Sequence, residues 1–564
     1  MLRRDHPADP RFTPLIDGGI AWLQTHQNHD GGWGDTVLSV SNISTSMLVR
    51  AAIPLAGATV PCAAALTRLE VYLERHCGKT PTQRAEAIRR RYGKDRTFAV
   101  PILVTCALAD LVSWNEVTPL PFELACFPQR WFRFLGIPVV SYALPALIAI
   151  GQAIHHYRPS WNPLVRLLRR GCIAKSLRVL QDIQPTSGGY LEAIPLTSFV
   201  TLSLASIGRG QHPVAQKGLE FIVQSVRPDG SWPIDTNLAT WVTTLAVNAL
   251  ANADDLDSLD RQEELQTWLV NQQFRVRHPF TGAAPGGFGW SDLPGALPDA
   301  DDTPGAVIAL CHLSPTKHRV CLARADAWIL GLQNRDGGWP TFCRGFGSLP
   351  FDRSGTDLTA HNLRALHVLQ SQNPDAARLH AQAQRRGLVY LERQQRADGS
   401  WLPLWFGNQY APDDENPTYG TVRALAAYRD LAMLDSDPAQ RGVAWLLRAQ
   451  NADGGWGGAS GIPSSVEETA LALEIVLGLA ESKALDAAGR GLTWLVDKVE
   501  AGEFRNPSPI GFYFAKLWYF EKLYPIIFIV AALGRARLDN FRIPLAYSDR
   551  PASSESPTLS RKRT

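Results

Sequence analysis

Apolar residues recur along most of the chain at the three- and four-residue spacing that places them on one face of an α-helix. Segments with this spacing are residues 240–251, 306–313, 358–369, 421–431 and 469–480. No region is dominated by the alternating pattern that is typical of strands. The pattern therefore predicts an all-α protein.

Between these segments one phrase recurs: a helix-like segment, a Gln, a polar turn containing Gly, and then a Trp. Strict copies occupy residues 21–33, 221–232, 328–339, 390–401 and 445–456, and looser copies occupy 177–190 and 268–290. The turn ends the helix, because Gly adopts the left-handed backbone without steric cost. The Gln can hydrogen-bond unpaired backbone groups at a neighbouring helix end, with the Trp packed against it. Seven such units predict a ring of paired helices, in which the repeated Gln and Trp residues are scaffold.

Length and charge narrow the class of protein. The chain has 564 residues, and a single core stops growing at roughly 250–300 residues, so two domains are predicted. Lys and Arg number 56 against 53 Asp and Glu, which supplies no broad positive field and argues against nucleic acid as a partner. Eight cysteines without a Cys-x-x-Cys pair favour reduced thiols in a cytosolic protein.

The sequence predicts neither a signal peptide nor a membrane-spanning helix. No apolar stretch follows the basic residues at the N-terminus. The longest uncharged run, residues 134–157, contains two Pro and two His, which favours a buried helix or one that dips into a single leaflet. The polar segment 546–564 is predicted to be disordered.

The clearest chemical signal is a cluster of three carboxylates, Asp299, Asp301 and Asp302. If they are partly buried, repulsion and lost solvation raise at least one pKa, so one group can keep a proton and act as an acid. A helix is predicted to start here, with Thr303 as its N-cap and Pro304 at its first position. Its N-terminus favours nearby negative charge. An acidic surface loop and a magnesium site are the alternatives for such a cluster.

With these repeats and this cluster, the sequence resembles the squalene–hopene and oxidosqualene cyclases, the triterpene branch of the class II terpene cyclases. The resemblance extends from residue 17 to about residue 525. It implies two α–α barrels, one inserted into the other, facing a large apolar cavity. The implied parts are an N-terminal arm (1–14) joining the catalytic barrel, an inserted barrel (15–237), the catalytic barrel (238–545) and the tail. It also implies attachment to one leaflet, at the cytoplasmic face of a membrane.

The resemblance assigns roles to the acid cluster. Residues 299–303 match the Asp-x-Asp-Asp-Thr motif with which squalene cyclases protonate an alkene. The match makes Asp301 the proton donor, tuned by Asp299 and Asp302. His361 matches the His that hydrogen-bonds this acid and, if cationic, raises its acidity. Tyr419 matches a Tyr that contacts the cluster through water.

Aromatic side chains are expected to stabilise carbocations, because the ring faces attract positive charge without capturing it. Packing in the core is the alternative role for each of them. The candidates by motif position are Trp241, Trp290, Trp405, Phe512, Tyr513 and Phe514.

The sequence therefore favours a cation-olefin cyclase that needs no metal, nucleotide or redox cofactor. The expected substrate is a linear isoprenoid hydrocarbon, with squalene first and a shorter or head-modified polyprene second. The reaction ends by proton loss, as an isomerase, or by water capture, as a lyase. Residues 44–46, Ser-Thr-Ser, stand where hopene-forming members carry a Glu, and residues 411–417 form an extra loop, so the product stays open.

Two rival functions and the oligomeric state also stay open. A prenyltransferase β-like subunit would share the barrel but would need Asp, Cys and His ligands for zinc. A non-catalytic lipid-binding repeat protein would keep the Trp repeats without needing Asp301 beside His361. A homodimer is compatible with the resemblance.

Overall fold

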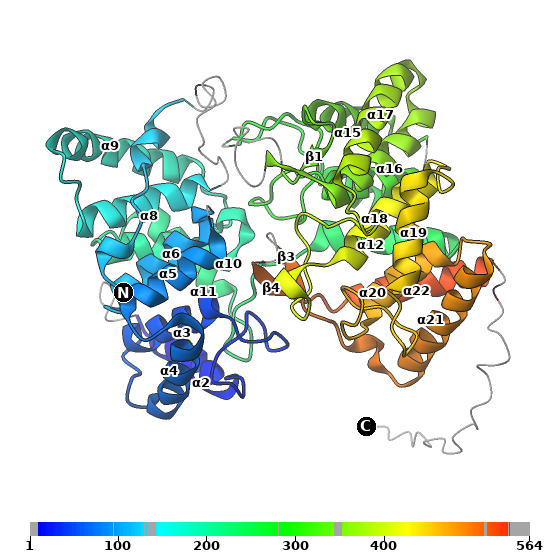
Figure 1. Ribbon diagram of the computed structural model, residues 1–564. Coiled ribbons are helices and arrows are strands. Elements are labelled where there is room, and N and C mark those ends of the chain that lie inside the picture. The colour runs from blue at the N-terminus through cyan, green and yellow to red at the C-terminus, as the bar shows by residue number, and fades with distance from the viewer. Residues whose placement is uncertain are drawn as a thin grey trace, which may run out of the picture.

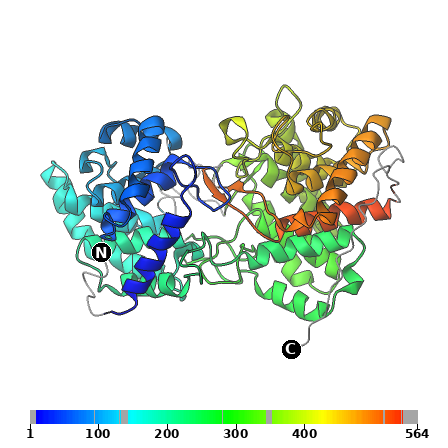
Figure 2. The same ribbon diagram turned by 90° about the horizontal axis from the view of Figure 1, so that it is seen from below.

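The computed structural model describes residues 9–93, 95–128, 131, 143–279, 281–314, 316–342, 352–512, 516–539 and 541. These residues are mostly helical and gather into two bodies that lie side by side in both views (Figures 1 and 2). The all-α prediction is confirmed. Within the described residues, four short strands form two antiparallel pairs, β1 (Trp339–Pro340) with β2 (Ser354–Gly355) and β3 (Ile510–Phe512) with β4 (Leu517–Tyr519).

The N-terminal body holds the helices up to residue 224, and its two hydrophobic clusters lie almost entirely within residues 33–215. Its helices are α2 (Phe12–Thr25), α3 (Ile43–Leu55), α4 (Ala63–Cys77), α5 (Pro81–Tyr92), α6 (Arg96–Leu108), α8 (Leu144–Tyr157), α9 (Pro163–Asp182), α10 (Ile194–Ser206) and α11 (Pro213–Gln224). Helix α8 is buried along most of its length, which confirms the buried alternative for the described part of the run 134–157.

The C-terminal body is built around a ring of six inner helices in the part of the chain that the structure describes. They are α12 (Ala239–Asn252), α14 (Asp302–Leu313), α16 (Thr356–Gln372), α18 (Pro417–Asp430), α20 (Val466–Val476) and α22 (Tyr524–Leu538). Each contacts the next, and α22 contacts α12, which closes the ring. The inner helices are apolar on nearly all sides because both of their faces are covered.

Outer helices cover this ring. They are α13 (Gln262–Asn271), α15 (Arg319–Leu332), α17 (Ala377–Gln394), α19 (Asp437–Arg448) and α21 (Ser482–Glu500). Helix α19 shows their pattern: it buries Ala439, Val443 and Leu446 against the ring while Arg441 is exposed. Short 3₁₀ turns lie at Trp114–Glu116, Phe122–Cys126, Tyr190–Glu192, Leu256–Ser258, Pro374–Ala376, Pro412–Asp414 and Glu503–Arg505.

The recurring Gln and Trp residues make the same contacts in copy after copy. Gln395 donates to the carbonyl of Gly399 in its own turn (2.8 Å) and to that of Pro438 near the start of α19 (2.8 Å). Trp401 donates its indole N–H to the carbonyl of Leu391 (2.7 Å), and its backbone N–H donates to Thr421 Oγ1 in α18 (3.0 Å). Gln27, Gln184, Gln273, Gln333 and Gln450 repeat the pair of glutamine bonds.

These contacts confirm the scaffold role and correct one detail of it. The second acceptor of each Gln lies in the first half of the next outer helix, as Ala383 does in α17. Unpaired carbonyls belong to the last turn of a helix, so the predicted unpaired partner is wrong. Each turn therefore joins one outer helix to the next and orients the inner helix that follows.

Several other predictions lie partly beyond the described residues. Arg11, within the predicted N-terminal arm, bonds Glu220 of α11 (2.9 Å), and the barrel boundaries stay a prediction. The seven described cysteines form no disulfide. The predicted disordered tail, 546–564, lies outside the described residues. Within the described residues, no helix has both the length and the apolar composition needed to cross a bilayer.

Replacing Gln395 with Ala should lower the free energy of unfolding by about 1–3 kcal/mol. The variant loses the bonds to Gly399 and Pro438 and leaves these carbonyls without their side-chain donor. Thermal or urea unfolding measures the change. The neighbouring Gln394 is exposed and provides the matched control. Equal stability of Gln395→Ala and Gln394→Ala would contradict the scaffold role.

Candidate active site

The first turns of the six inner helices meet at one end of the ring, which we call the mouth. Trp241, Tyr419, Glu467 and Tyr524 begin four different helices and line one cavity there. Asp301, at the start of α14, bonds His361 in the second turn of α16. Because the positive ends of the helix dipoles converge at the mouth, acidic side chains are favoured there.

The three carboxylates lie at the start of α14 in an arrangement that their spacing explains. The Oδ1 atom of Asp299 accepts the backbone N–H groups of Asp301 (2.8 Å) and Asp302 (2.7 Å). Asp299 therefore satisfies two of the helix's unpaired donors. The predicted cap is wrong: Asp301 is the N-cap residue, and Thr303 lies inside the helix, where its hydroxyl accepts the Phe288 N–H (2.9 Å).

The three carboxyl groups differ in how deeply they are buried. Asp299 and Asp302 are each 4% exposed, so the surface-loop alternative is wrong. Burial raises the pKa of Asp299 to about 7, against the lowering effect of its hydrogen bonds. Burial also raises the pKa of Asp302 well above its ordinary value, with help from the neighbouring carboxylates. At neutral pH the cluster carries fewer than three negative charges, as the sequence predicts.

Asp301 is the most accessible of the three carboxylates, because its side chain is 23% exposed. Its Oδ1 lies 2.7 Å from Nδ1 of His361, whose side chain is 8% exposed. Burial lowers the pKa of His361, although the contact with Asp301 acts in the opposite direction. The structure thus brings the predicted pair together and favours a neutral imidazole, whereas a cationic His361 was one expectation.

Tyr419 lies beside this pair on α18. The side chain is buried, its ring centroid is 4.6 Å from that of Phe406, and the Arg423 guanidinium lies 4.9 Å from the ring centroid. Burial raises the pKa of Tyr419, and the nearby charge of Asp301 contributes to the same direction. Its contact with the acid through water stays a prediction.

Three of the six predicted aromatic residues, Trp290, Trp405 and Phe512, belong to one continuous series of ring contacts. The centroid distances are 6.2 Å for Trp290–Phe342, 5.4 Å for Phe342–Trp405 and 5.9 Å for Trp405–Phe512. Trp290, Phe342 and Trp405 also pack against a hydrophobic cluster of the N-terminal body, so this part of the series lies where the two bodies meet.

The series continues into the mouth. Phe512 contacts Tyr519 (4.9 Å), which contacts Tyr524 (6.0 Å), and the hydroxyls of these two tyrosines are 2.7 Å apart. Trp241 donates its indole N–H to the Tyr524 hydroxyl (2.5 Å). We call these eight residues, Trp241, Trp290, Phe342, Trp405, Phe512, Tyr519, Tyr524 and Phe528, the aromatic belt, because Phe528 packs on Tyr524 (5.5 Å). Tyr513 and Phe514 lie outside the described residues.

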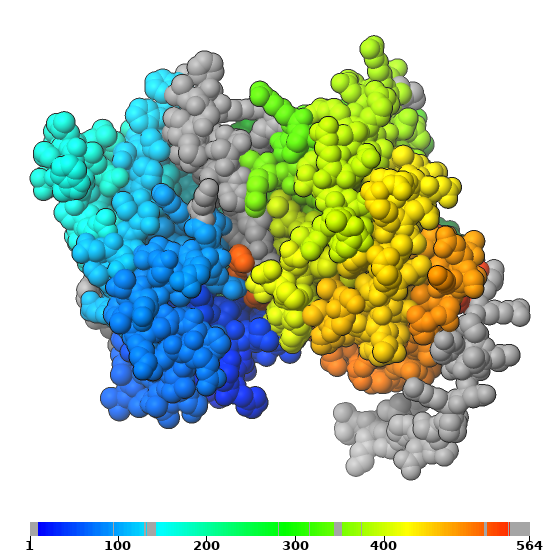
Figure 3. All heavy atoms as spheres, viewed as in Figure 1, coloured from blue at the N-terminus to red at the C-terminus, as the bar shows by residue number. Residues whose placement is uncertain are grey.

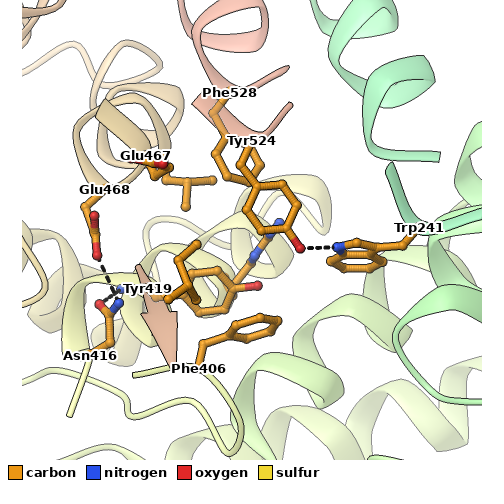
Figure 4. Close-up of a pocket in the computed structure, with 11 residues that line it drawn as sticks. Trp241, Phe406, Asn416, Tyr419, Glu467, Glu468, Tyr524 and Phe528 are labelled. Carbon is orange, nitrogen blue, oxygen red and sulfur yellow. Dashed lines mark hydrogen bonds between the residues drawn. The ribbon is translucent and has the colours of Figure 1, made fainter. Parts of the chain in front are cut away.

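The cavity at the mouth is small, with a volume of about 10 Å³ (Figure 4). Its wall is aromatic and aliphatic over most of its extent, and four side chains bring charged or amide groups, Asn416, Arg423, Glu467 and Glu468. Figure 4 shows Trp241 and Tyr524 joined by their hydrogen bond on one side, with the two glutamates on the other.

Several residues of the site were not predicted from the sequence. Asp357 accepts the Leu404 N–H (3.0 Å), and burial raises its pKa to about 6. Phe342 follows Trp339 at almost the spacing with which Trp405 follows Trp401, a signal that could have identified it. Arg423 and Glu467 carried no such signal. Within the described part of the chain, no three His, Cys, Asp or Glu residues are grouped to hold a metal.

Comparison with known proteins defines the class. Over 94% of this chain and 93% of the other, the fold matches the ent-copalyl diphosphate synthase of Streptomyces platensis, with a TM-score of 0.56 and 18% identity. This is the fold of the class II terpene cyclases. Residues 237–538 match the family model of the squalene-hopene cyclase C-terminal domain. The chain belongs to the squalene–hopene cyclase family.

Relatives in this family carry different names. The probable squalene–hopene cyclase of Sinorhizobium fredii is 24% identical over 88% of this chain and 84% of its own length. The enfumafungin synthase of Hormonema carpetanum is 26% identical over 88% of this chain, which spans only 42% of that protein. The drimenyl diphosphate synthase of Streptomyces showdoensis is 30% identical over 50% of this chain and 47% of its own.

Replacing Asp302 with Asn should change how the unfolding free energy depends on pH. Because folding raises the pKa of Asp302 above its ordinary value of 3.8, the unfolded chain loses this proton first as the pH rises. The wild type therefore loses stability above about pH 4, and Asn, with no proton to lose, does not. We expect the stability of Asp302→Asn relative to wild type to rise by up to about 1.4 kcal/mol per pH unit.

Urea unfolding at a series of pH values measures this difference. The exposed Asp375 serves as control, since Asp375→Asn should follow the wild-type curve. A constant difference between Asp302→Asn and wild type from about pH 4 to about pH 8 would contradict a raised pKa for Asp302.

Proposed function

We propose that this protein is a class II cyclase in which Asp301 protonates the terminal double bond of a linear isoprenoid. The observation that carries the proposal is the difference among the three carboxylates. Asp299 and Asp302 are enclosed, whereas Asp301 keeps an accessible surface at the mouth while His361 holds its Oδ1. A positioned carboxylic acid of this kind is the group that general acid catalysis requires.

The aromatic surroundings of the acid can stabilise the carbocation that protonation of the alkene produces. Removing the alkene π bond leaves a positive charge on carbon, and each further double bond that attacks it forms a ring and moves the charge along the chain. The aromatic belt offers ring faces beside this path, each contributing about 0.5–2 kcal/mol to a nearby cation. Trp290, Phe342 and Trp405 extend the belt between the bodies, where an apolar substrate is shielded from water.

Squalene is the first substrate that we propose, with a polycyclic triterpene as product. A shorter or head-modified polyprene is the second, because one relative is named drimenyl diphosphate synthase. The proposed reaction needs neither metal nor redox cofactor, since Asp301 supplies the proton. The two barrel domains keep their predicted limits, 15–237 and 238–545, in this proposal.

We also propose that the protein attaches to one membrane leaflet through α9. Trp161 and Leu164 are 91% and 75% exposed, and Leu167 and Leu168 follow at helical spacing with 69% and 54%. The exposed Arg170, Lys175 and Arg178 lie farther along the same helix. Apolar side chains flanked by basic ones suit an anionic lipid surface. Helix α9 lies at the outer edge of the N-terminal body (Figures 1 and 3).

Asp301→Asn should abolish cyclisation, because the amide cannot donate the proton. We expect turnover to fall by about 10⁴-fold. The assay incubates detergent-solubilised protein with squalene and with shorter polyprenes, free and diphosphorylated, and identifies products by mass spectrometry. Absence of cyclic product from every substrate, with folded wild-type protein, would overturn the proposed function.

A second Asp–His pair provides the matched control for Asp301→Asn. Asp326 Oδ1 lies 2.8 Å from His380 Nε2, and both residues are buried between the outer helices α15 and α17. Asp326→Asn should lower the melting temperature and retain turnover per folded molecule. An active Asp301→Asn variant would remove Asp301 from the proposed role.

Replacing Leu164 and Leu167 together with Asp should weaken binding to anionic phospholipid vesicles by about tenfold or more, because two apolar contacts with lipid are lost. Vesicle flotation measures the bound fraction. Val320 is 69% exposed on the C-terminal body, so Val320→Asp is the control and should bind as wild type does. Unchanged flotation of the double variant would exclude α9 as the attachment site.

A further inference from the structure

Two adjacent glutamates lie in the first turn of α20, and their carboxylates differ in hydrogen bonding. Glu467 and Glu468 are 2% and 5% exposed, and both line the cavity at the mouth. Glu468 is fully engaged: its Oε1 accepts the side-chain amides of Asn408 (3.1 Å) and Asn416 (3.1 Å), and its Oε2 accepts the Ser465 hydroxyl. Figure 4 shows its carboxylate turned to Asn416.

Glu467 has only one of its oxygens bonded. Its Oε1 accepts the backbone N–H of Ser508 (2.8 Å), while Oε2 is buried without a hydrogen-bond partner among the described residues. A buried carboxylate oxygen without a donor is costly and rare. Burial raises the pKa of Glu467 to about 7, and the neighbouring Glu468 adds to the rise. An unpaired, basic oxygen beside a cavity can accept a proton.

The ring of inner helices places Glu467 opposite the acid. In the order α12, α14, α16, α18, α20 and α22, helices α14 and α20 are three places apart in either direction. Neighbouring helix axes are about 8–10 Å apart, so opposite axes in a six-membered ring are about 16–20 Å apart. Asp301 and Glu467 therefore lie at the starts of helices on opposite sides of the ring.

The residues between these two groups connect them into one site. Tyr419 and Tyr524 line the cavity with Glu467, and the charge of Asp301 acts on the pKa of both tyrosines. Arg423 lines the same cavity, and the charges of Tyr419 and Asp301 raise its pKa. Its guanidinium places a positive charge in the same cavity wall as Glu467.

We infer that Glu467 is the catalytic base that ends the reaction, a step that rests on the proposed function. The C–H bond next to the last carbocation breaks, its electron pair forms the new C=C bond, and the proton passes to Oε2 of Glu467. The charge on carbon and the charge on the carboxylate are both neutralised. Asp301 has given one proton and Glu467 has taken one, so the net reaction is an isomerisation. Exchange with solvent restores both groups.

The test compares Glu467→Gln with Glu481→Gln, a glutamate variant outside the cavity. Each variant is incubated with the polyprene that wild type turns over, and every product is quantified by mass spectrometry. We expect Glu467→Gln to consume substrate and to form the wild-type alkene about 100-fold more slowly, with isomeric alkenes and alcohols in its place. Glu468→Gln alters the same cavity wall, so the exposed Glu481 after α20 supplies the control, and Glu481→Gln should keep the wild-type product ratio.

Glu467→Asp keeps a carboxylate and should recover part of the wild-type alkene, which guards against misfolding of the glutamine variant. An unchanged product ratio in Glu467→Gln, or a wild type that forms only alcohols, would overturn the assignment while leaving Asp301 as the acid. Wild-type protein inactive on every substrate would instead overturn the proposed function.

Discussion

The burial of carboxyl groups at the start of α14 is the constraint on which the rest of the site depends. A carboxylate removed from water loses solvation that protein groups must replace. Two backbone N–H groups replace the lost solvation of Asp299 by hydrogen bonds, and the positive end of the α14 dipole stabilises the negative charge of the whole cluster. Burial raises the pKa of Asp302, which favours its uncharged form. Asp301 alone keeps an accessible surface, and His361 fixes its direction.

The scaffold explains why these groups meet. Each turn that follows a repeated Gln holds the next outer helix, and the Trp after it bonds a hydroxyl near the start of the next inner helix, as Trp339 bonds Thr359 (3.1 Å). The inner helices therefore start at one end of the ring. Side chains distant in sequence, such as Trp241 and Tyr524, come into hydrogen-bond contact there. The repeats do no chemistry, yet they determine where the chemistry is placed.

Local patterns were sufficient to predict the helices and the scaffold, whereas the Asp301–His361 pair was predicted from the resemblance to the cyclases. Helical spacing and the Asp-Gly turns are short-range signals, and the acid cluster lies within four residues. The prediction of Thr303 as the helix cap was wrong. A capping interaction depends on which side chain reaches the free N–H groups, and here Asp299 accepts the N–H groups of both Asp301 and Asp302. The spacing of Asp299 and Thr303 around the helix start allowed either residue to serve.

Long-range contacts were beyond the sequence. Tyr519, Tyr524 and Phe342 join the aromatic belt only because β3, β4 and the turn after Trp339 meet at the mouth. Nothing in the pattern around Glu467 distinguishes it from Glu468, since both lie in the first turn of α20. Their difference arises from partners supplied by other segments, Ser508 for one and Asn408 with Asn416 for the other.

Arg423 adds a further condition on the path of positive charge. Its pKa is raised by the nearby Tyr419 and Asp301 against the effect of burial, so it remains cationic within the cavity wall. Like charges repel strongly where water is scarce. In the proposed reaction, a carbocation beside Arg423 is therefore less stable than one beside belt residues outside this cavity, such as Trp290 and Trp405. A cation that reaches the cavity next to Glu467 is under the greatest pressure to lose a proton, and the unpaired Oε2 is within the same wall to accept it.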